Sequence, residues 1–566
     1  MKSQLLRYSK LLKKLSRPLS TAVAPELTRQ QIHGSAWSKE LDKEAAAKIP
    51  RGNEIINEKQ IFEYIEKTKE DAKDVEKVRE VLSRALERAT LTKVPNDVEL
   101  TSEYVQGLNG EEAATLLNID STNRLLMSEL FKTALDIKER IYGNRIVLFA
   151  PLYLANYCVN SCTYCAFRSK NKHIARSSLT DEEIRYEVET LEKMGHRRLL
   201  LLTGEHPKYT FDDFLRVVHV VAGVRTEPCG NIRRINVEIP ALSISDFRRL
   251  KETGEIGTYT LFQETYHKDS FKHVHPDGPK SDFEYRLQTM DRAQIAGIDD
   301  VGIGALFGLF DYRFEALAML QHANHLEKHY KAGPHTISIP RMRPADQAPS
   351  SIHPPAPVSD ADFLKLVAVL RCAVPYTGMI LSTRESAHMR RKLLHLGISQ
   401  MSAGSKTDVG AYAKGDQQTE LDSFGTSPHL DLFDHLDQHP ETQDNAQKAA
   451  ATELKGQFSL LDHRSLDEIV RDLMDHGFVP SWCTACYRTG RTGKSFMNIA
   501  KRGNIHNYCH PNAMLTLQEY IQDYASDSTK KVAERVIEKE KKTLSRPDAL
   551  NRKLEKIMQG ERDLYF

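Results

Sequence analysis

The feature that most constrains the fold is an alternation of short apolar segments with amphipathic ones through the middle of the chain. Eight segments have the apolar character of buried strands, at 146–150, 199–203, 235–239, 258–263, 301–307, 335–340, 379–383 and 397–403. Most of the intervals between them carry a helical pattern, as in 181–193. Strands joined by helices run parallel, because the helix returns the chain to the same edge of the sheet.

Eight such units predict an α/β fold, a (β/α)8 TIM-type barrel. An open, doubly wound sheet is the alternative. The chain has 566 residues, which is too long for a barrel alone. We therefore expect an N-terminal helical region, the barrel, a polar insertion or linker, and a mainly helical C-terminal region, at 26–140, 141–405, 406–455 and 456–566 respectively.

The first 25 residues differ in charge from the rest of the chain. No acidic residue precedes Glu26, and the basic residues there are Lys2, Arg7, Lys10, Lys13, Lys14 and Arg17. Leucines and a tyrosine among them form one apolar stripe on a helix. This pattern predicts an organelle-targeting presequence at 1–25 and a location in an organelle matrix, that of a hydrogenosome, mitochondrion or plastid. A basic N-terminal helix without targeting function is the simpler alternative.

The composition is that of a globular protein. Hydrophobic residues make up 40% of the chain and charged residues 28%, and no apolar run is long enough to cross a membrane. We therefore expect no membrane as a partner, and because the formal net charge is only +2 we expect no nucleic acid either. The eight cysteines are too sparse for a disulfide framework, and two of them, Cys229 and Cys372, stand alone as core or loop thiols.

Three cysteines follow the first predicted strand, where a barrel carries its active-site loops. Cys158, Cys162 and Cys165 have the spacing C-x3-C-x2-C, with the aromatic Tyr164 before the last of them. Three thiolates on one loop can hold three corners of a [4Fe–4S] cluster and leave the fourth iron open. An open iron can chelate the amino and carboxylate groups of S-adenosyl-L-methionine (SAM) and deliver an electron to its sulfonium. A zinc site or three buried thiols would be the structural alternative.

The second predicted strand ends in Thr203, Gly204 and Glu205. A carboxylate at the end of a strand, beside a glycine that permits close approach of the backbone, suits the cationic amino group of SAM. We therefore predict that these three residues contribute to the SAM site, together with Tyr164.

A second group of cysteines lies far along the chain. Cys483, Cys486 and Cys509 have the spacing C-x2-C-x22-C, with no fourth cysteine nearby. A second Fe–S cluster with a non-cysteine ligand on one iron is one interpretation. A zinc ion whose tetrahedron is completed by His506 or His510 is the other.

Both cysteine groups, together with the segments 256–267, 296–309, 333–341 and 381–385, make the chain resemble the HydG family. These are radical SAM tyrosine lyases of [FeFe]-hydrogenase maturation, and the resemblance extends from about residue 50 to residue 560. A sister family, the tyrosine lyases of thiamine synthesis (2-iminoacetate synthases), shares the barrel but lacks the second cysteine group.

The resemblance implies a specific reaction. A 5′-deoxyadenosyl radical would take a hydrogen atom from the amino group of L-tyrosine, and cleavage of the Cα–Cβ bond would give p-cresol and dehydroglycine. Dehydroglycine would then yield carbon monoxide and cyanide at an auxiliary Fe–S cluster that carries an extra iron. The product would be an Fe(CO)2(CN) synthon for the hydrogenase H-cluster. A reductant such as ferredoxin and other hydrogenase maturation proteins are the implied partners.

Residue roles follow from the same resemblance. Arg384, at the end of the seventh strand, would bind the tyrosine carboxylate, with a structural salt bridge as the alternative. Glu238 would contact the SAM ribose or the substrate. The extra iron needs a histidine, and His335 is favoured over His322 and His325 because it precedes the sixth strand at the barrel floor. The remaining alternatives to a HydG-type lyase are a thiamine-type or biotin-type radical SAM enzyme and a non-enzymatic Fe–S carrier.

Overall fold

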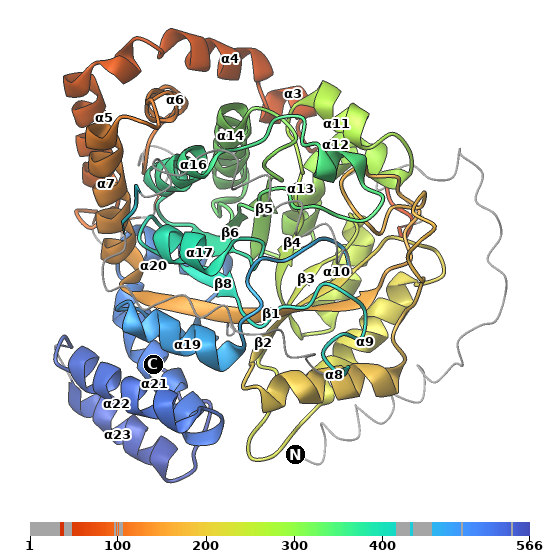
Figure 1. Ribbon diagram of the computed structural model, residues 1–566, viewed down its shortest axis with the longest axis vertical. Helices are drawn as coiled ribbons and strands as arrows, with labels where there is room; N and C mark the ends of the chain where they lie inside the picture. The colour runs from red at the N-terminus through yellow and green to blue at the C-terminus, as the bar shows by residue number, and fades with distance from the viewer. Residues whose placement is uncertain are drawn as a thin grey trace.

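Eight parallel strands close into a barrel, so the predicted α/β fold class is confirmed and the open sheet is wrong (Figure 1). Strands β2 to β8 pair in chain order, and β1 closes the ring because it pairs with both β2 and β8. The eight strands are β1 Arg145–Ala155, β2 Arg198–Thr203, β3 Arg234–Glu238, β4 Ile256–Thr260, β5 Val301–Gly304, β6 Thr336–Ser338, β7 Gly378–Leu381 and β8 Gln400–Ser402.

The computed structural model describes residues 34–38, 48–94, 98, 100, 106–414, 431–433, 456–487, 491–544 and 547–566. The predicted presequence at 1–25 lies outside these residues, as does most of the predicted insertion at 406–455. None of the described helices combines the length and apolar character that a bilayer crossing requires.

Helices fill the intervals between the strands, as the sequence pattern predicts. The segment 181–193 is helix α8, which begins at a capping box of Thr180 with Glu183 and buries Ile184, Val188 and Leu191 against the strands. The helices of the barrel are α8 Asp181–Lys193, α9 Phe211–Gly223, α10 Ile244–Glu252, α11 Lys268–Val274, α12 Phe283–Leu287, α13 Thr289–Ile295, α14 Tyr312–Tyr330, α15 Pro349–Ile352, α16 Asp360–Ala373 and α17 Ala387–Leu394.

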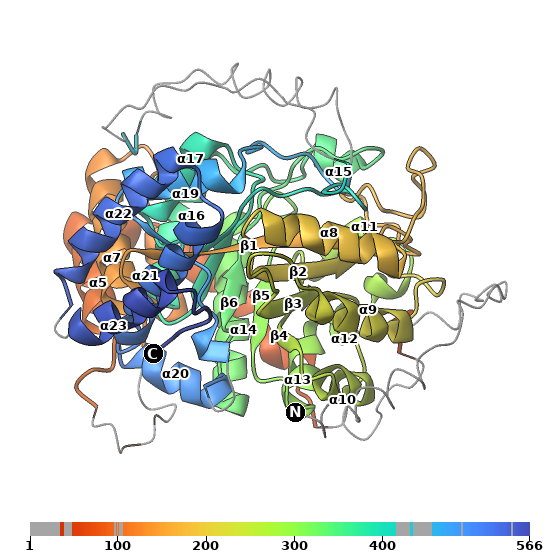
Figure 2. The same ribbon diagram turned by 90° about the horizontal axis from the view of Figure 1, so that it is seen from below.

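Helices from both ends of the chain pack on one side of the barrel. Those before the barrel are α3 Gly52–Ile55, α4 Glu58–Lys67, α5 Val75–Glu87, α6 Gly110–Leu117 and α7 Arg124–Tyr142. Those after it are α19 Leu466–Asp475, α20 Gly493–Lys501, α21 His506–Asp523, α22 Asp527–Lys541 and α23 Pro547–Met558. Helix α7 contacts α21, and Figure 2 shows the two groups of helices overlapping beside the barrel.

A short strand that the sequence analysis did not predict joins the C-terminal region to the barrel. Strand β9, Val479–Ser481, pairs in parallel with the first residues of β1, Arg145 to Val147. The predicted first strand ended at 150, just before Pro151, but β1 continues to Ala155, and all of its residues are buried. Strand β1 therefore begins beside β9 at the barrel floor and ends at the barrel mouth, just before the first cysteine loop.

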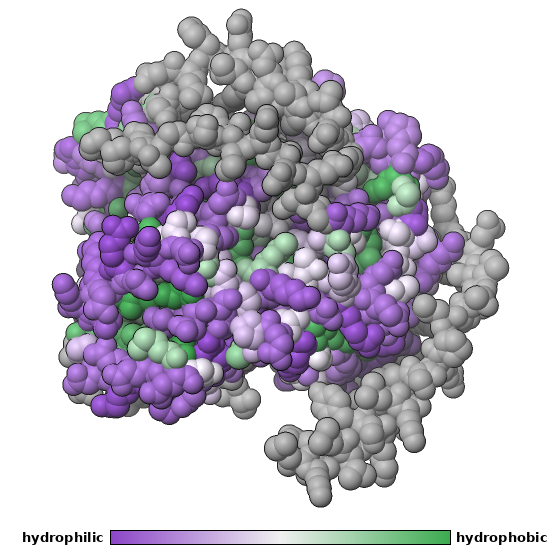
Figure 3. Space-filling view, turned by 60° about the horizontal axis from the view of Figure 1, so that its bottom comes forward, coloured by the Kyte–Doolittle hydropathy of each residue, from purple (hydrophilic) through white to green (hydrophobic). Residues whose placement is uncertain are grey.

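The described surface is mostly hydrophilic, and Figure 3 shows its hydrophobic residues in small separate patches on one face. Exposed large side chains such as Phe62, Leu125 and Tyr186 belong to three different helices, α4, α7 and α8. Scattered exposure of this kind is ordinary for a folded protein.

A buried carboxyl group on α14 makes the stability of the barrel depend on pH. Burial raises the pKa of Glu315 to about 8, although the group accepts hydrogen bonds from the Thr265 hydroxyl and, at 2.8 Å, from the Tyr266 amide. Because its pKa in the folded state lies above that in the unfolded chain, its contribution to stability is complete below about pH 4.5 and is lost as pH rises through about 8.

We therefore expect Glu315→Gln to flatten the fall of the melting temperature between pH 5 and pH 9. The glutamine side chain keeps an acceptor for the Tyr266 amide and gains a donor for the Thr265 hydroxyl. The pH-dependent free energy of unfolding that the substitution removes amounts to about 1.4 kcal/mol per unit of pKa shift. Thermal unfolding followed by circular dichroism measures it. Glu63→Gln, on the exposed face of α4, is the matched control; an equal flattening in both variants would contradict the assignment.

Candidate active sites at the two ends of the barrel

The first cysteine loop lies at the barrel mouth and is fixed by backbone hydrogen bonds. The Val159 amide donates to the Glu205 carbonyl at 2.8 Å, and the Thr163 amide donates to the Val274 carbonyl at 3.0 Å. Cys162 is buried, whereas Cys158 and Cys165 are half-buried. The loop therefore holds three thiols within one preformed, largely enclosed region.

Burial determines the acid–base behaviour of these thiols. It raises the pKa of Cys162 to about 12, and it also raises the pKa values of Cys158 and Cys165, while the positive charge of Lys280 opposes each of these shifts. Thiolates are the form that binds iron, so the positively charged iron–sulfide core of a cluster would stabilise them here, with release of protons. Three soft ligands beside a lysine fit an anionic thiolate-bound cluster.

The structure places the predicted SAM residues at the same end of the barrel. Gly204 lies so close to the first cysteine loop that a Cβ atom there would come within 2.2 Å of the Tyr157 carbonyl oxygen, so only glycine fits. Thr203 ends β2, and its hydroxyl donates to the Gly204 carbonyl at 3.0 Å. Glu205 is buried, and its two carboxylate oxygens accept hydrogen bonds from the Ala36 amide and the Asn160 side chain, both at 2.7 Å.

Tyr164, within the first cysteine loop, is buried against the end of α11. Its hydroxyl forms a hydrogen bond of 2.7 Å with Nε2 of His275, and the two rings meet edge to face. The structure therefore shows a packing and hydrogen-bonding role for this aromatic residue, and a contact with SAM stays a prediction.

Glu238, the last residue of β3, and Arg384, in the loop after β7, lie at the barrel mouth and influence each other electrostatically. Burial and the nearby Glu264 raise the pKa of Glu238 to about 7, while Arg384 is among the cations that oppose this rise. The Arg384 guanidinium stacks on the Phe458 ring, with 3.3 Å between its central carbon and the ring centroid. Among the described residues it forms no ion pair, which argues against a purely structural salt bridge.

Glu264, just after β4, is a site residue that the sequence analysis missed. Its carboxylate is buried and pairs with Lys280 at 2.6 Å and with Arg286 at 3.5 Å. Its φ angle is 71°, a left-handed conformation that is uncommon for any residue other than glycine. Backbone strain of this kind is frequent at functional sites. The sequence could have indicated Glu264, because it lies inside the segment 256–267 on which the family resemblance rests.

The second cysteine group lies at the barrel floor, directly after β9. Cys483 follows the strand, Cys486 lies in the short helical turn Ala485–Tyr487, and Cys509 lies in the first turn of α21. Burial, together with Cys509, raises the pKa of Cys483 to about 11, and Cys486 interacts electrostatically with both other thiols. The structure therefore brings together three cysteines that are separated in the sequence.

Two arginines lie near the second cysteine group at the barrel floor. Nη1 of Arg198 donates to the Cys483 carbonyl at 2.7 Å. Arg145 is buried, and its Nε and Nη1 atoms donate no hydrogen bond within the described part of the chain. Both guanidinium groups lower the pKa of Cys483. Two buried arginines near three thiols, with Nε and Nη1 of Arg145 unpartnered among the described residues, fit an anionic Fe–S cluster at this position.

The structure places one of the three candidate histidines at the barrel floor and the other two on a surrounding helix. His335 precedes β6 at the floor, where it contacts Phe496, and burial lowers its pKa to about 4, with Arg198 and Arg145 among the cations that contribute. It is therefore in the neutral form that binds metals. His322 and His325 lie on α14, outside the barrel, where they form hydrogen bonds with Tyr266 and Asp291.

The zinc interpretation requires four ligand atoms around one point. Across the residues that the structure describes, no three His, Cys, Asp or Glu side chains converge in this way. His510, one of the two candidate fourth ligands, lies 3.2 Å from the Glu540 carboxylate. A cubane needs no such convergence, because each of its cysteines binds a different iron.

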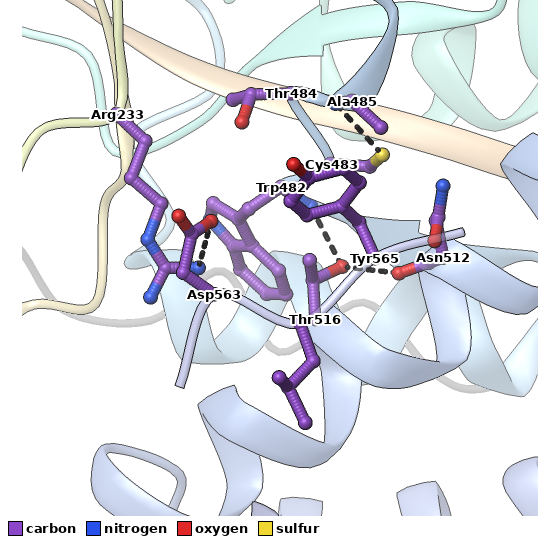
Figure 4. A pocket seen from close by; sticks show the side chains of 10 residues that line it. Arg233, Trp482, Cys483, Thr484, Ala485, Asn512, Thr516, Asp563 and Tyr565 are labelled. Atoms are coloured by element: carbon purple, nitrogen blue, oxygen red, sulfur yellow. Dashed lines mark hydrogen bonds and ion pairs between the residues drawn. The ribbon is translucent and has the colours of Figure 1, made fainter. Parts of the chain in front are cut away.

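A small pocket lies beside Cys483 (Figure 4). Two buried donors at its wall, Nε1 of Trp482 and Nδ2 of Asn512, have no hydrogen-bond partner in the described structure. The lining residues are Arg233, Trp482, Cys483, Thr484, Ala485, Asn512, Thr516, Asp563, Leu564 and Tyr565. The second cysteine group is therefore adjacent to a space with room for about one water-sized molecule, beside two unpartnered donors of the described structure.

Comparison with known proteins agrees with this geometry. The model of the radical SAM superfamily matches residues 152–321, and that of the biotin and thiamin synthesis associated domain matches residues 338–479. A crystal structure of HydG, a maturase of the [FeFe]-hydrogenase, is 44% identical, covers 90% of this chain and 100% of its own, and has a TM-score of 0.76. The chain belongs to the HydG family.

Further relatives place the HydG assignment within its superfamily. The HydG structure from Carboxydothermus hydrogenoformans is 36% identical, with a TM-score of 0.70 and coverage of 90% of this chain and 100% of that one. The 2-iminoacetate synthase of Escherichia coli is 35% identical over 340 residues, which are 60% of this chain and 85% of that protein. As a HydG-family member the chain is a radical SAM enzyme, whose cofactors are a [4Fe–4S] cluster and SAM.

Proposed function

We propose that this protein is a tyrosine lyase that cleaves L-tyrosine to p-cresol and dehydroglycine, and converts the latter to carbon monoxide and cyanide for an Fe(CO)2(CN) synthon. The observation that carries the proposal is the presence of two cysteine groups at opposite ends of one barrel, in a chain that is 44% identical to a HydG structure. The E. coli 2-iminoacetate synthase, by its name the enzyme of the alternative family, matches only 60% of the chain.

The residues of the barrel mouth would position the first reaction. Cys158, Cys162 and Cys165 would hold a [4Fe–4S] cluster, which when bound with SAM supplies the radical that starts the cleavage. Arg384 would bind the tyrosine carboxylate with both of its parallel N–H donors. Its guanidinium, which stacks on Phe458 and forms no ion pair among the described residues, supports this role.

Glu238 would lie on the opposite side of the substrate from Arg384. Its pKa of about 7 lets it exchange a proton in the neutral pH range. The closed barrel wall would exclude water from the reacting atoms, which protects radical chemistry from quenching.

The residues of the floor would bind the auxiliary cluster. Cys483, Cys486 and Cys509 would be its ligands, with Arg145 and Arg198 balancing the negative charge. We propose His335 as the ligand of the extra iron, because it is neutral and lies close to the same two arginines. The pocket beside Cys483 would receive small products.

The physiological setting is also a proposal. The acid-free basic leader supports import into an organelle matrix and removal of residues 1–25. A reductant such as ferredoxin and other hydrogenase maturation proteins would be the partners, because the reaction consumes electrons and its product serves another enzyme.

Anaerobic incubation of the reconstituted protein with SAM, dithionite and tyrosine tests the proposed function. We expect 5′-deoxyadenosine, p-cresol, carbon monoxide and cyanide. Formation of p-cresol without carbon monoxide would instead favour a thiamine-type lyase. A protein that never yields 5′-deoxyadenosine would be an Fe–S carrier, and the proposal would fail.

We expect Arg384→Lys to raise the KM for tyrosine roughly ten- to a hundredfold, because a lysine cannot form the paired, charge-assisted hydrogen bonds of a guanidinium. Initial rates of p-cresol formation measure this change. The KM for SAM serves as the internal control, since Arg384 faces the substrate; an equal rise in both KM values would contradict the assignment.

A further inference from the structure

The segment 456–462, which follows the predicted insertion, lies across the barrel mouth. The Gln457 amide donates to the Thr407 carbonyl at 2.9 Å, and the Gln457 carbonyl accepts from the Ala166 amide at 3.2 Å. Farther along, the Leu461 amide donates to the Thr383 carbonyl at 3.1 Å. The segment is therefore fastened to the first cysteine loop and to the loops after β7 and β8.

The side chain of Gln457 connects the first strand with the first cysteine loop. Its Oε1 accepts a hydrogen bond of 2.8 Å from the hydroxyl of Tyr153, which is a buried residue of β1. Its Nε2 donates to Sγ of Cys165 at 3.6 Å. A primary amide has its acceptor at one end and its donors at the other, so the tyrosine hydroxyl fixes the orientation in which the N–H group faces the sulfur.

We propose that Gln457 is a positioning residue of the radical SAM site, which raises the reduction potential of the cluster by donating a hydrogen bond to the Cys165 thiolate. Hydrogen bonds to the cysteine sulfurs are one of the factors that set the potential of an Fe–S cluster. A donor stabilises the more negative, reduced form more than the oxidised form, because the added electron increases the charge on the sulfurs. The inference rests on the cluster at the barrel mouth and is independent of tyrosine as the substrate.

The next residue gives the segment a second contact with the site. Phe458 stacks on Arg384 and packs against Ala166, Ala345 and Ala348. One short segment therefore touches both a cluster-binding cysteine and the arginine proposed for the substrate. This arrangement offers a matched control, because Phe458→Leu disturbs the same segment without removing the donor to sulfur.

Anaerobic redox titration of the reconstituted protein, followed by electron paramagnetic resonance of the reduced cluster, tests the proposal. We expect Gln457→Leu to shift the midpoint potential to a more negative value, Tyr153→Phe to shift it less in the same direction, and Phe458→Leu to leave it unchanged. We also expect an exchangeable proton near the cluster, detected by electron–nuclear double resonance, to disappear in Gln457→Leu.

Unchanged potentials in both Gln457→Leu and Tyr153→Phe, at unaltered iron content, would overturn the proposal while the proposed function stands. If Gln457→Leu fails to assemble a cluster, Tyr153→Phe carries the test alone, because it leaves the glutamine in place. An unaltered protein without any cluster signal would instead overturn the proposed function, and this inference with it.

Discussion

Cys165→Ala is expected to reduce formation of 5′-deoxyadenosine from SAM to the background of a reaction without protein. Two thiolates cannot hold three irons of a cubane, so the open iron that would bind SAM is lost. The variant should keep the barrel fold, because Cys165 is half-buried and belongs to a loop rather than to a strand. Chromatographic assay of 5′-deoxyadenosine and measurement of iron content report the effect.

Cys229→Ser is the matched control for this prediction. Cys229 is also a half-buried loop cysteine, but it lies between α9 and β3, at the opposite end of the barrel from the first cysteine loop. We expect this variant to retain the activity. If Cys165→Ala continued to cleave SAM, the three-cysteine loop would not be the radical SAM site, and the assignment of the barrel mouth would be wrong.

The double variant Cys483→Ala, Cys486→Ala is expected to separate the two halves of the proposed reaction. Formation of p-cresol should stay within a few-fold of the unaltered rate, because the barrel mouth is untouched. Release of carbon monoxide should fall to the assay background, because only one of the three thiols at the floor remains. Trapping of carbon monoxide by deoxyhaemoglobin and chromatography of p-cresol provide both measurements from one reaction.

Thr484→Ser, in the same loop and without a change of sulfur ligands, controls for local disturbance of the floor. Circular dichroism of the double variant distinguishes a chemical role from a structural one. Loss of folding together with loss of both products would indicate a structural metal site of the zinc type. Carbon monoxide release by a folded double variant would show that the second cysteine group has no part in the chemistry.

The barrel was predictable because its signal is local. Each of the eight strands lies in a short, mostly apolar segment and most of its residues are buried, so hydropathy together with the intervening helical patterns identifies it. Strand β9 carries no such signal, because its middle residue is Pro480, a residue that is unusual inside a sheet. It exists as a strand only through its pairing with the start of β1, far away in the sequence.

The candidate sites show the same division between local and distant information. The cysteine loops and the Thr203–Glu205 turn follow from spacing and from their position after a strand. The contacts of Glu205 with Ala36 and of Arg384 with Phe458 join segments that no periodicity connects. The choice of His335 followed from topology, because a residue that precedes a barrel strand lies at the floor, whereas His322 sits on a surrounding helix.

Strand β1 has a mechanical consequence for the proposed chemistry. One cysteine group lies beside its first residues and the other follows its last, so a single rigid element of roughly 30 Å fixes how far apart the two reaction centres lie. A short-lived intermediate would then diffuse from the first reaction centre to the second over a constant distance, without a domain closure before the transfer. The transit time would be a built-in property of the scaffold, which the lifetime of the intermediate must exceed.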